Sequence, residues 1–277
     1  MAETSLYLQT ETSPFMMSIV LVTSKNRTVV IDGGRPEDMP LLREIVGDRE
    51  IGAWILTHPH LDHISGFTDL VLKGDPELVP KRIYYNFPPL EFVEKYEADE
   101  AHTLREFLEI EEMISDRTVI VKEGDSFDVD ELSFTVLQSW DSDSPIVPLR
   151  ESDHNSVGNE SSLIFRIDTP GKSVLILGDA GPLAGDRLFA RHMNDLDADI
   201  VQVAHHGHGG VGAEIYIASG ASACLWCCPD WLYDEEAYVI GDRLCGTAVT
   251  RRWLEKIGIK ENYVTKDGTH KIVLASE

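Results

Sequence analysis

The sequence predicts an α/β fold, in the broad sense that includes α+β, with two layers of β-sheet covered by helices. Three observations support this fold class. Strand-like and helix-like segments occur in both halves of the chain. No linker or internal repeat separates the halves, so residues 1–277 are expected to form a single domain. The chain has 277 residues, 43% of them apolar, which is enough to bury a large core between packed layers.

The first half begins with β-strands. Runs of β-branched or aromatic residues bounded by turn residues predict strands at Leu6–Leu8, Met16–Thr23 and Thr28–Ile31. A short helix is expected over Met39–Val46, and a further strand over Ile51–Leu56. These segments supply the strands of one sheet together with a helix that covers it.

Residues 88–116 form a strongly acidic segment with apolar residues at helical spacing. We expect a helical insertion here, consisting of a solvated helix pair packed on the domain. The alternative is a lid over the active site, because inserted elements often cover sites.

The second half returns to strands. A strand is expected at Thr118–Val121 and a hairpin within Phe127–Trp140. Polar residues predict a long loop over Asp141–Asn159, and the runs Ser162–Ile167 and Ser173–Leu177 predict a second hairpin. The remaining elements expected are helices and strands at Arg187–Met193, Asp199–Ala204, Thr250–Ile257, Tyr263–Val264 and Lys271–Leu274.

The cysteines and the N-terminal residues indicate the compartment. The pair Cys224 and Cys227 has the spacing of half a zinc site, but it lies in a strand-like run and no second pair exists. Buried core cysteines are therefore expected, because a free cysteine behaves as a small apolar side chain. Neither a signal peptide nor a membrane-spanning run is visible. We expect a cytoplasmic protein without a membrane partner.

The charge of the chain limits its partners. Forty-eight acidic and 24 basic residues give a formal net charge of −24. Such a charge repels nucleic acid at long range and keeps the protein soluble. A small-molecule or ester substrate is therefore expected rather than nucleic acid, and the sequence does not determine the oligomeric state.

Four candidate metal ligands lie within one short segment after the strand at Ile51–Leu56. They are His58, His60, Asp62 and His63. Imidazole and carboxylate ligands together suit zinc, iron or manganese. Histidines this dense are difficult to explain as core residues or as solvated surface, so a metal site is predicted here.

Two further candidate ligands also follow strands. Asp179 comes after Leu177 and Gly178, and His205 comes after Ala204. The ends of parallel strands meet at one edge of a sheet, so these side chains are expected to converge with the histidine segment. A carboxylate at Asp179 could bridge two ions about 3.5–4 Å apart, an arrangement that suits hydrolysis.

Taken together, these motifs resemble the metallo-β-lactamase superfamily. The resemblance implies a four-layer αββα sandwich with a dinuclear site at one edge. It implies that His58 and His60 bind metal 1, that Asp62 and His63 bind metal 2, and that Asp179 bridges the ions. The nucleophile would be a metal-bound hydroxide. The ions are expected to be Zn²⁺, with Mn²⁺ or Fe²⁺ as alternatives.

Within the superfamily, the second half resembles the hydrolase domain of competence DNA-uptake proteins and bacterial phosphorylcholine esterases. The segments that carry this likeness are Asn159 to Ile164, Leu177 to Asp179, Val203 to Gly207 and Thr265 to Ile272. Both relatives act on phosphodiesters. The resemblance implies a metal-dependent hydrolase of a phosphodiester or another ester. The alternatives are a competence-type nuclease and a non-catalytic metal-binding scaffold with an incomplete site.

Several assignments within the site remain open. The third ligand of metal 1 is either His154 or Asn159. Of the two adjacent histidines, we expect His205 to be the ligand and His206 to lie beside it, although their roles could be exchanged. Asp62 and His206 are expected to take part in catalysis.

Three residues near the motifs have alternative roles. Asp32, before Gly33 and Gly34, is expected to form a turn and to hydrogen-bond the histidine segment. Trp231 and Tyr233 either line a substrate pocket or pack in the core. An aromatic pocket in an acidic protein would suit a quaternary ammonium such as choline.

Overall fold

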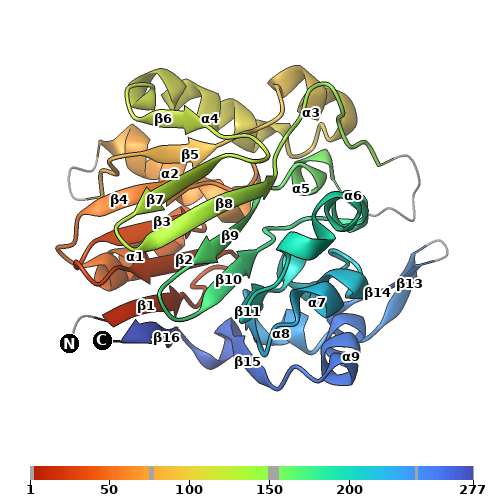
Figure 1. Cartoon of the computed structure of the whole chain (residues 1–277). Coiled ribbons are helices and arrows are strands. Elements are labelled where there is room, and N and C mark those ends of the chain that lie inside the picture. The colour runs from red at the N-terminus through yellow and green to blue at the C-terminus, as the bar shows by residue number, and fades with distance from the viewer. Residues whose placement is uncertain (1–2, 75–77, 149–155, 241–242, 277) are drawn as a thin grey trace.

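The computed structural model describes residues 3–74, 78–148, 156–240 and 243–276. Two seven-stranded sheets face each other, and helices cover both outer faces (Figure 1). The first sheet has, in spatial order, β16 (His270–Ser276), β1 (Glu3–Leu8), β2 (Ser18–Val22), β3 (Thr28–Asp32), β4 (Ile51–Ile55), β5 (Ile83–Tyr85) and β6 (Thr118–Ile120). The second has β15 (Glu261–Val264), β12 (Ala223–Trp226), β11 (Ile200–Gln202), β10 (Ser173–Ile176), β9 (Ile164–Asp168), β8 (Leu132–Gln138) and β7 (Ser126–Val129). A two-stranded ribbon joins β13 (Tyr238–Ile240) to β14 (Arg243–Cys245).

The helices lie between these strands along the chain. They are α1 (Met39–Val46), α2 (Leu61–Lys73), α3 (Leu90–Tyr96), α4 (Ala101–Ile114), α5 (Val157–Glu160), α6 (Pro182–His192), α7 (Ala213–Ser219), α8 (Asp230–Tyr233) and α9 (Thr247–Ile257). Among the described residues, no helix is both long and apolar enough to cross a membrane.

The alternation of side chains along the strands produces the layers. Along β10, Val174 and Ile176 enter the core between the sheets, whereas Leu175 joins the core beneath the helices of the second sheet. Along β4, Ile55 faces the central core and Trp54 faces the helices of the first sheet. Successive side chains of a strand point to opposite faces, so both faces of each sheet are covered. The architecture is the predicted αββα sandwich.

Both sheets are antiparallel on one side and parallel on the other. In the first sheet, β3, β4, β5 and β6 run parallel, and in the second β10, β11, β12 and β15 do so. The first and last described strands, β1 and β16, pair antiparallel, so the two ends of the chain lie together (Figure 1). The parallel strands carry the candidate ligands at their carboxyl ends.

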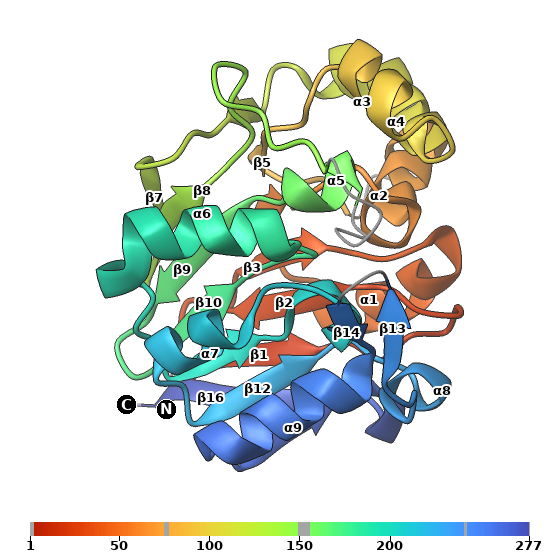
Figure 2. The ribbon, with the colours of Figure 1, turned by 90° about the vertical axis from the view of Figure 1, so that its right-hand side faces the viewer.

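Some boundaries differ from the sequence-based expectations for local reasons. The helix expected at Arg187–Met193 begins earlier, at Pro182, because proline is favoured in the first turn of a helix. The loop expected to extend to Asn159 ends in α5, where the Ser156 side chain accepts a hydrogen bond from the Asn159 amide. The acidic segment forms α3 and α4, which lie together beside α2 (Figure 2).

The cysteines lie where the sequence predicted. Cys224, Cys227, Cys228 and Cys245 are all buried with free thiols. Burial raises the pKa of the Cys224 thiol to about 12. A protonated thiol in the core is a poor metal ligand, so these residues contribute packing rather than a zinc site.

Candidate metal centre and active site

The histidine segment connects β4 to α2. His58 lies in the loop, His60 precedes the first helical residue, and Asp62 and His63 occupy the first turn of α2. The helix therefore turns Asp62 and His63 back toward the loop. Backbone hydrogen bonds from the amides of His63 and Ile64 to the His60 carbonyl hold this turn closed.

Asp32, at the end of β3, holds the segment in place. Its buried carboxylate accepts hydrogen bonds from the Thr57 amide at 2.7 Å and the Thr57 hydroxyl at 2.8 Å, and lies 2.7 Å from His63 Nδ1. Its φ of 58° lies in the left-handed region, which is uncommon for a residue with a side chain. The predicted hydrogen bonding of Asp32 to the histidine segment is confirmed, whereas its carboxylate bonds Thr57 and His63 instead of closing the turn expected at Gly33 and Gly34.

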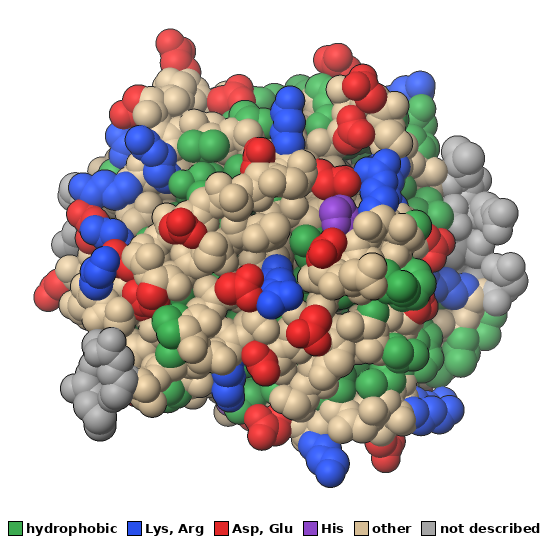
Figure 3. All heavy atoms as spheres, in the orientation of Figure 1, with side chains coloured by type: hydrophobic (Ala, Val, Ile, Leu, Met, Phe, Trp, Pro, Cys, Tyr) green, Lys and Arg blue, Asp and Glu red, His purple; other side chains and the backbone are tan. Residues whose placement is uncertain are grey.

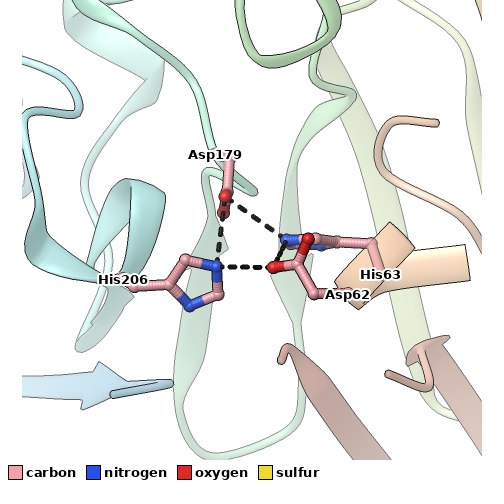
Figure 4. A group of neighbouring side chains, drawn as sticks. All are labelled: Asp62, His63, Asp179 and His206. Atoms are coloured by element: carbon pink, nitrogen blue, oxygen red, sulfur yellow. Dashed lines mark hydrogen bonds and ion pairs between the residues drawn. The ribbon is translucent and has the colours of Figure 1, made fainter. Parts of the chain in front are cut away.

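Four buried side chains meet at the edge of the sandwich. Asp62, His63, Asp179 and His206 each offer a ligand atom, and these atoms lie within 4.8 Å of one another. All four side chains point to a common centre (Figure 4). The three strand ends that supply them belong to two sheets, so the meeting point is an edge of the sandwich rather than of one sheet.

The two histidines of this group face both carboxylates. His206 Nε2 lies 3.0 Å from Asp62 Oδ2 and 3.2 Å from Asp179 Oδ2. His63 Nε2 lies 3.4 Å and 3.3 Å from the same two oxygens. The alternation of basic and acidic atoms around one point is the arrangement expected of ligands that share a cation.

The charges of the group dominate its protonation. Burial alone would raise the pKa of Asp62 and of Asp179, but His63 and His206 hold both pKa values well below the usual range. Burial alone would lower the pKa of His206, yet the charge of Asp179 and hydrogen bonds to Asp179 and Asp62 raise it to about 10. Two carboxylates ionised in the protein interior require compensating positive charge, which either imidazolium or a metal ion supplies.

His58 and His60 lie on one side of this group. Burial and repulsion by His63 hold the pKa of His58 well below its usual value, so the ring is neutral. The His58 and His60 rings stand 4.5 Å apart, and His60 Nε2 lies 3.1 Å from Glu97 Oε1. The structure therefore brings all four candidate ligands of the histidine segment to one place.

The buried ring atoms fit a metal. The Thr57 hydroxyl donates to Asp32, so it can only accept from His58 Nδ1, 3.1 Å away, which leaves a lone pair on His58 Nε2. That Nε2 is buried without a hydrogen-bond partner in the described part of the chain, and so is Asp179 Oδ1. Orphaned buried polar atoms are costly, and a bound cation would satisfy both.

The outer nitrogens of the rings are held in the way metal-binding histidines require. His206 Nδ1 donates to the Cys227 carbonyl at 2.6 Å, His63 Nδ1 faces Asp32, and His60 Nε2 faces Glu97. A partner on one nitrogen fixes the tautomer and orients the other nitrogen toward the metal. This residue set fits one or more divalent ions.

The two adjacent histidines point in different directions. Both have a φ of 51°, a left-handed conformation within the short helix Ala204–Gly207. His206 enters the four-residue group, whereas His205 Nε2 lies 3.3 Å from the Asn159 side-chain nitrogen. Burial lowers the pKa of His205 to about 3, so this ring is neutral. Sequence reasoning favoured His205 as the ligand; in the structure it is His206 that faces the carboxylates.

The two candidates for the third metal-1 ligand differ in what can be said of them. His154 lies outside the described residues. Asn159 is buried on α5 and lines the pocket in front of the group, with its side chain next to His205.

A pocket of about 670 Å³ opens in front of the four-residue group. Asp62, Asp179 and His206 lie on its wall together with aromatic, acidic and basic side chains from distant segments. The other lining residues are Phe15, Arg35, His60, Leu61, Glu97, Glu100, Ser156, Asn159, His205, His208, Trp231, Leu232 and Glu235. The volume suits a small molecule.

The two aromatic residues expected near the pocket differ in their positions, and so do the parts of the acidic helical segment. Trp231 lines the pocket, but Tyr233 packs against Trp226 with ring centroids 5.2 Å apart. The acidic helix pair packs on the first sheet through Leu104 and Phe107, as expected of a solvated pair packed on the domain. Only the α3–α4 connection, with Glu97 and Glu100, reaches the pocket.

Sequence reasoning missed several residues of the site. Glu97 lies in a run of acidic residues and carries no local mark of its contact with His60. Phe15 and Arg35 precede the histidine segment and belong to no motif. Glu235, 2.7 Å from His208 Nδ1, is likewise unmarked. Each reaches the site through the fold of the chain.

Comparisons with solved structures agree with the fold. The metallo-beta-lactamase fold protein YhfI from Bacillus subtilis aligns with a TM-score of 0.57 at 13% identity, over 98% of this chain and 100% of that chain. Zn²⁺-bound PqqB from Methylobacterium extorquens aligns with a TM-score of 0.52 at 18% identity, over 92% and 86%. The CmlA β-hydroxylase aligns with a TM-score of 0.53 at 12% identity, over 98% of this chain and 54% of that chain. At these identities the likeness concerns the fold.

A search of curated proteins found no match to the sequence. The family model of the metallo-beta-lactamase superfamily matches residues 13–208, which contain the histidine segment, Asp179 and His206. The chain belongs to the metallo-beta-lactamase superfamily, whose members are typically metal-dependent hydrolases.

Proposed function

We propose that the chain is a metal-dependent hydrolase that cleaves a small phosphodiester or another ester with two divalent ions, Zn²⁺ before Mn²⁺ or Fe²⁺. One observation carries the proposal: two carboxylates and two imidazoles form a buried group, three members of which line a pocket the size of a small molecule. Ionisable groups held in this way at a pocket are typical of catalytic sites.

The residues divide into two ligand sets. Asp62, His63 and His206 would hold one ion, and His58 and His60 the other. Asp179 would serve both, because Oδ2 faces His63 and His206 while the buried Oδ1 has no hydrogen-bond partner among the described residues. His205 and Asn159, which are in contact and line the same pocket, would complete the second set.

The side chains around the ions determine what the site can do. When bound, the ions would supply a nucleophile at neutral pH and would neutralise charge on the attacking and leaving oxygens. Asp32, Glu97 and the Cys227 carbonyl hold the ligand rings in fixed orientations. The pocket wall, formed by residues such as Phe15 and Trp231, would bind the substrate and exclude water from one side.

The phosphodiester preference rests on sequence motifs. The likeness of Asn159–Ile164, Leu177–Asp179 and Val203–Gly207 to competence-type hydrolase domains and phosphorylcholine esterases supports it. A site with two ions also suits phosphodiesters, because it can stabilise both oxygens of an in-line displacement.

Two other functions are less well supported. For a nuclease, the chain should carry a basic track, but its net charge is −24, and on the face drawn in Figure 3 Lys and Arg are scattered among Asp and Glu. For a non-catalytic scaffold, the four-residue group should be disrupted, whereas its charges and orienting partners are all present. The same fold also occurs in a β-hydroxylase, so fold alone does not fix the reaction.

The test combines metal content with turnover. Purified protein is expected to hold one to two divalent ions per chain by elemental analysis and to hydrolyse bis-p-nitrophenyl phosphate. Asp179→Asn should lose both properties, and Asp128→Asn, at an exposed carboxylate on β7, should keep them. Metal-free, inactive wild-type protein after reconstitution with Zn²⁺, Mn²⁺ and Fe²⁺ would exclude the proposed function.

A further inference from the structure

One wall of the pocket combines a cation with two aromatic rings from distant segments. The Arg35 guanidinium lies over the Phe15 ring, with its Cζ 5.3 Å from the ring centroid. The Phe15 ring packs edge-on against two other rings, with centroid distances of 5.2 Å to His206 and 6.2 Å to Trp231. Phe15 therefore contacts both Arg35 and a residue of the four-residue group, and all three line the same pocket.

Among the described residues, Arg35 is held in place by groups that do not neutralise its charge. Its Nε donates to the Phe15 carbonyl at 3.3 Å. The nearby Asp38 carboxylate accepts from the backbone amides of Thr12 and Arg35 and from the Thr12 and Ser13 hydroxyls. Asp38 is thus engaged with other donors, and in the described ranges no carboxylate forms an ion pair with the Arg35 guanidinium.

Four of the five carboxylates that line the pocket face a histidine, and for the fifth, Glu100, the described residues supply no ion pair. Asp62 and Asp179 face His63 and His206, Glu97 faces His60, and Glu235 faces His208. These contacts join a carboxylate oxygen to an imidazole nitrogen at 2.7 to 3.4 Å. Among the described lining residues, Arg35 is the only Lys or Arg. Its guanidinium is the positive charge available to a ligand at a distance from the metal centre.

Trp231 adds a flat apolar surface beside this charge. Its indole nitrogen donates to the Pro14 carbonyl at 3.2 Å, which fixes the ring, and the residue is 56% exposed. An exposed indole held by its N–H presents a face on which a planar group can stack. Arginine and an aromatic face together suit a ligand that carries an anion next to a ring.

We propose that Arg35, Phe15 and Trp231 form a substrate subsite for a second anionic group. The substrate class is a small diester that bears, beside its scissile bond, a ring and a further phosphate or carboxylate. This inference rests on the proposed hydrolase function and narrows its substrate. It also argues against a choline-like group on this wall, because the guanidinium repels a quaternary ammonium.

A matched pair of chromogenic diesters tests the subsite. Thymidine 5′-(p-nitrophenyl phosphate) and its 3′-phosphorylated form differ only in the added phosphate. Wild-type enzyme is expected to show a kcat/KM higher by roughly 10-fold or more for the 3′-phosphorylated diester, the size of one charge-assisted hydrogen-bond set. Arg35→Gln should reduce this ratio to about 1. Arg82→Gln, which removes the same charge at an exposed position outside the pocket, should keep it.

The outcomes separate the subsite from the hydrolase function. If wild-type enzyme cleaves both diesters equally, or if Arg35→Gln keeps the preference, the subsite is wrong and the hydrolase function stands. If wild-type enzyme reconstituted with metal cleaves neither these diesters nor bis-p-nitrophenyl phosphate, the hydrolase function fails. In that case calorimetry measures the binding of thymidine 3′,5′-bisphosphate and of thymidine 5′-monophosphate. The ratio of the two affinities then tests the subsite, with the same preference for the added phosphate expected. Arg35→Lys, which keeps a charge but loses the planar fork, replaces Arg35→Gln if that variant does not fold, and an intermediate ratio is expected.

Discussion

The two sides of the candidate metal centre come from differently built parts of the molecule. On one side, His58, His60, Asp62 and His63 lie within a single loop and the first helical turn after β4. On the other side, Asp179 follows β10, and His206 lies in a short helix after β11. The first side is one local segment, whereas the second is assembled from separate strand ends of the other sheet.

This difference also applies to how the rings are oriented. His63 is held by Asp32 from the neighbouring strand of its own sheet. His206 is held by the Cys227 carbonyl, beyond the end of the adjacent strand β12. His60, by contrast, is held by Glu97 from the acidic helical segment. The local segment supplies the chemistry, and the orientation of its rings depends on partners that only the fold brings near.

The strongest test of the second side is Asp179→Asn. Asp179 faces both histidines of the group, and its other oxygen is buried. Replacing the carboxylate removes a ligand charge between His63 and His206. Metal affinity should fall by more than the roughly 10–100-fold typical of losing an outer partner, and turnover should become undetectable. A chelator competition assay measures the affinity, and wild-type affinity in this variant would remove Asp179 from the ligand set.

The adjacent histidines allow a sharper comparison. His206→Ala should cost metal affinity on the scale of Asp179→Asn, because the ring faces both carboxylates. His205→Ala should cost less, since His205 lies beside Asn159 and outside the group. His102→Ala, at an exposed histidine of α4, serves as the control. Equal losses for His205→Ala and His206→Ala would show that both adjacent histidines bind metal.

The parts of the site that the sequence predicted are those determined by residues close together in the chain. The strand end at Leu56 and the spacing of His58, His60 and Asp62 are local, so the sequence predicted this side and the sandwich that carries it. Asp179 was also predicted, because it directly follows a clear strand. The choice between the adjacent histidines depends on a left-handed backbone conformation at both positions. A histidine in the sequence does not predict this conformation, because it is uncommon for residues with a side chain.

Other parts of the site carry no local signal at all. Glu97 reaches His60 only because α4 packs on α2 and brings the α3–α4 connection to the pocket. Arg35 and Trp231 meet through Phe15, although they are far apart in the sequence. Long-range packing of this kind cannot be read from periodicity or spacing, which report only neighbours along one element.

Asp32→Asn tests the orientation of the local side. The carboxylate accepts every hydrogen bond it makes with Thr57 and His63. An amide would place an N–H against one of these donors, at a cost of about 1–3 kcal/mol in stability for a group left unsatisfied. Metal affinity should fall roughly 10–100-fold.

The control for Asp32→Asn is Asp130→Asn. Asp130 also has a left-handed φ, but it pairs with Lys25 and Arg27 and is not among the lining residues of the pocket. Thermal unfolding should report a loss of stability in both variants, and chelator competition a loss of metal affinity in Asp32→Asn alone. A loss of stability without a change in affinity for Asp32→Asn would show that Asp32 supports the fold of the histidine segment without orienting a metal ligand.

The smallest effect is expected for Glu97, which joins the acidic helical segment to the local side. Its Oε1 lies 3.1 Å from His60 Nε2 and its Oε2 accepts from the Gly158 amide at 2.8 Å. Burial would raise the pKa of Glu97, but the contact with His60 lowers it below the usual value, so the carboxylate is ionised. Glu97→Ala should lower metal affinity about 10-fold, the lower end of the range for outer partners. It should also speed hydrogen exchange at the Gly158 amide.

Glu97→Gln should restore part of the affinity, because its side-chain oxygen still accepts a hydrogen bond. Glu109→Ala, on the exposed face of α4, should change neither the metal affinity nor the exchange rate. Unchanged affinity in Glu97→Ala would mean that the acidic helices pack beside the metal centre without orienting its ligands. The ligand rings on both sides would then be oriented only by partners at the ends of neighbouring strands.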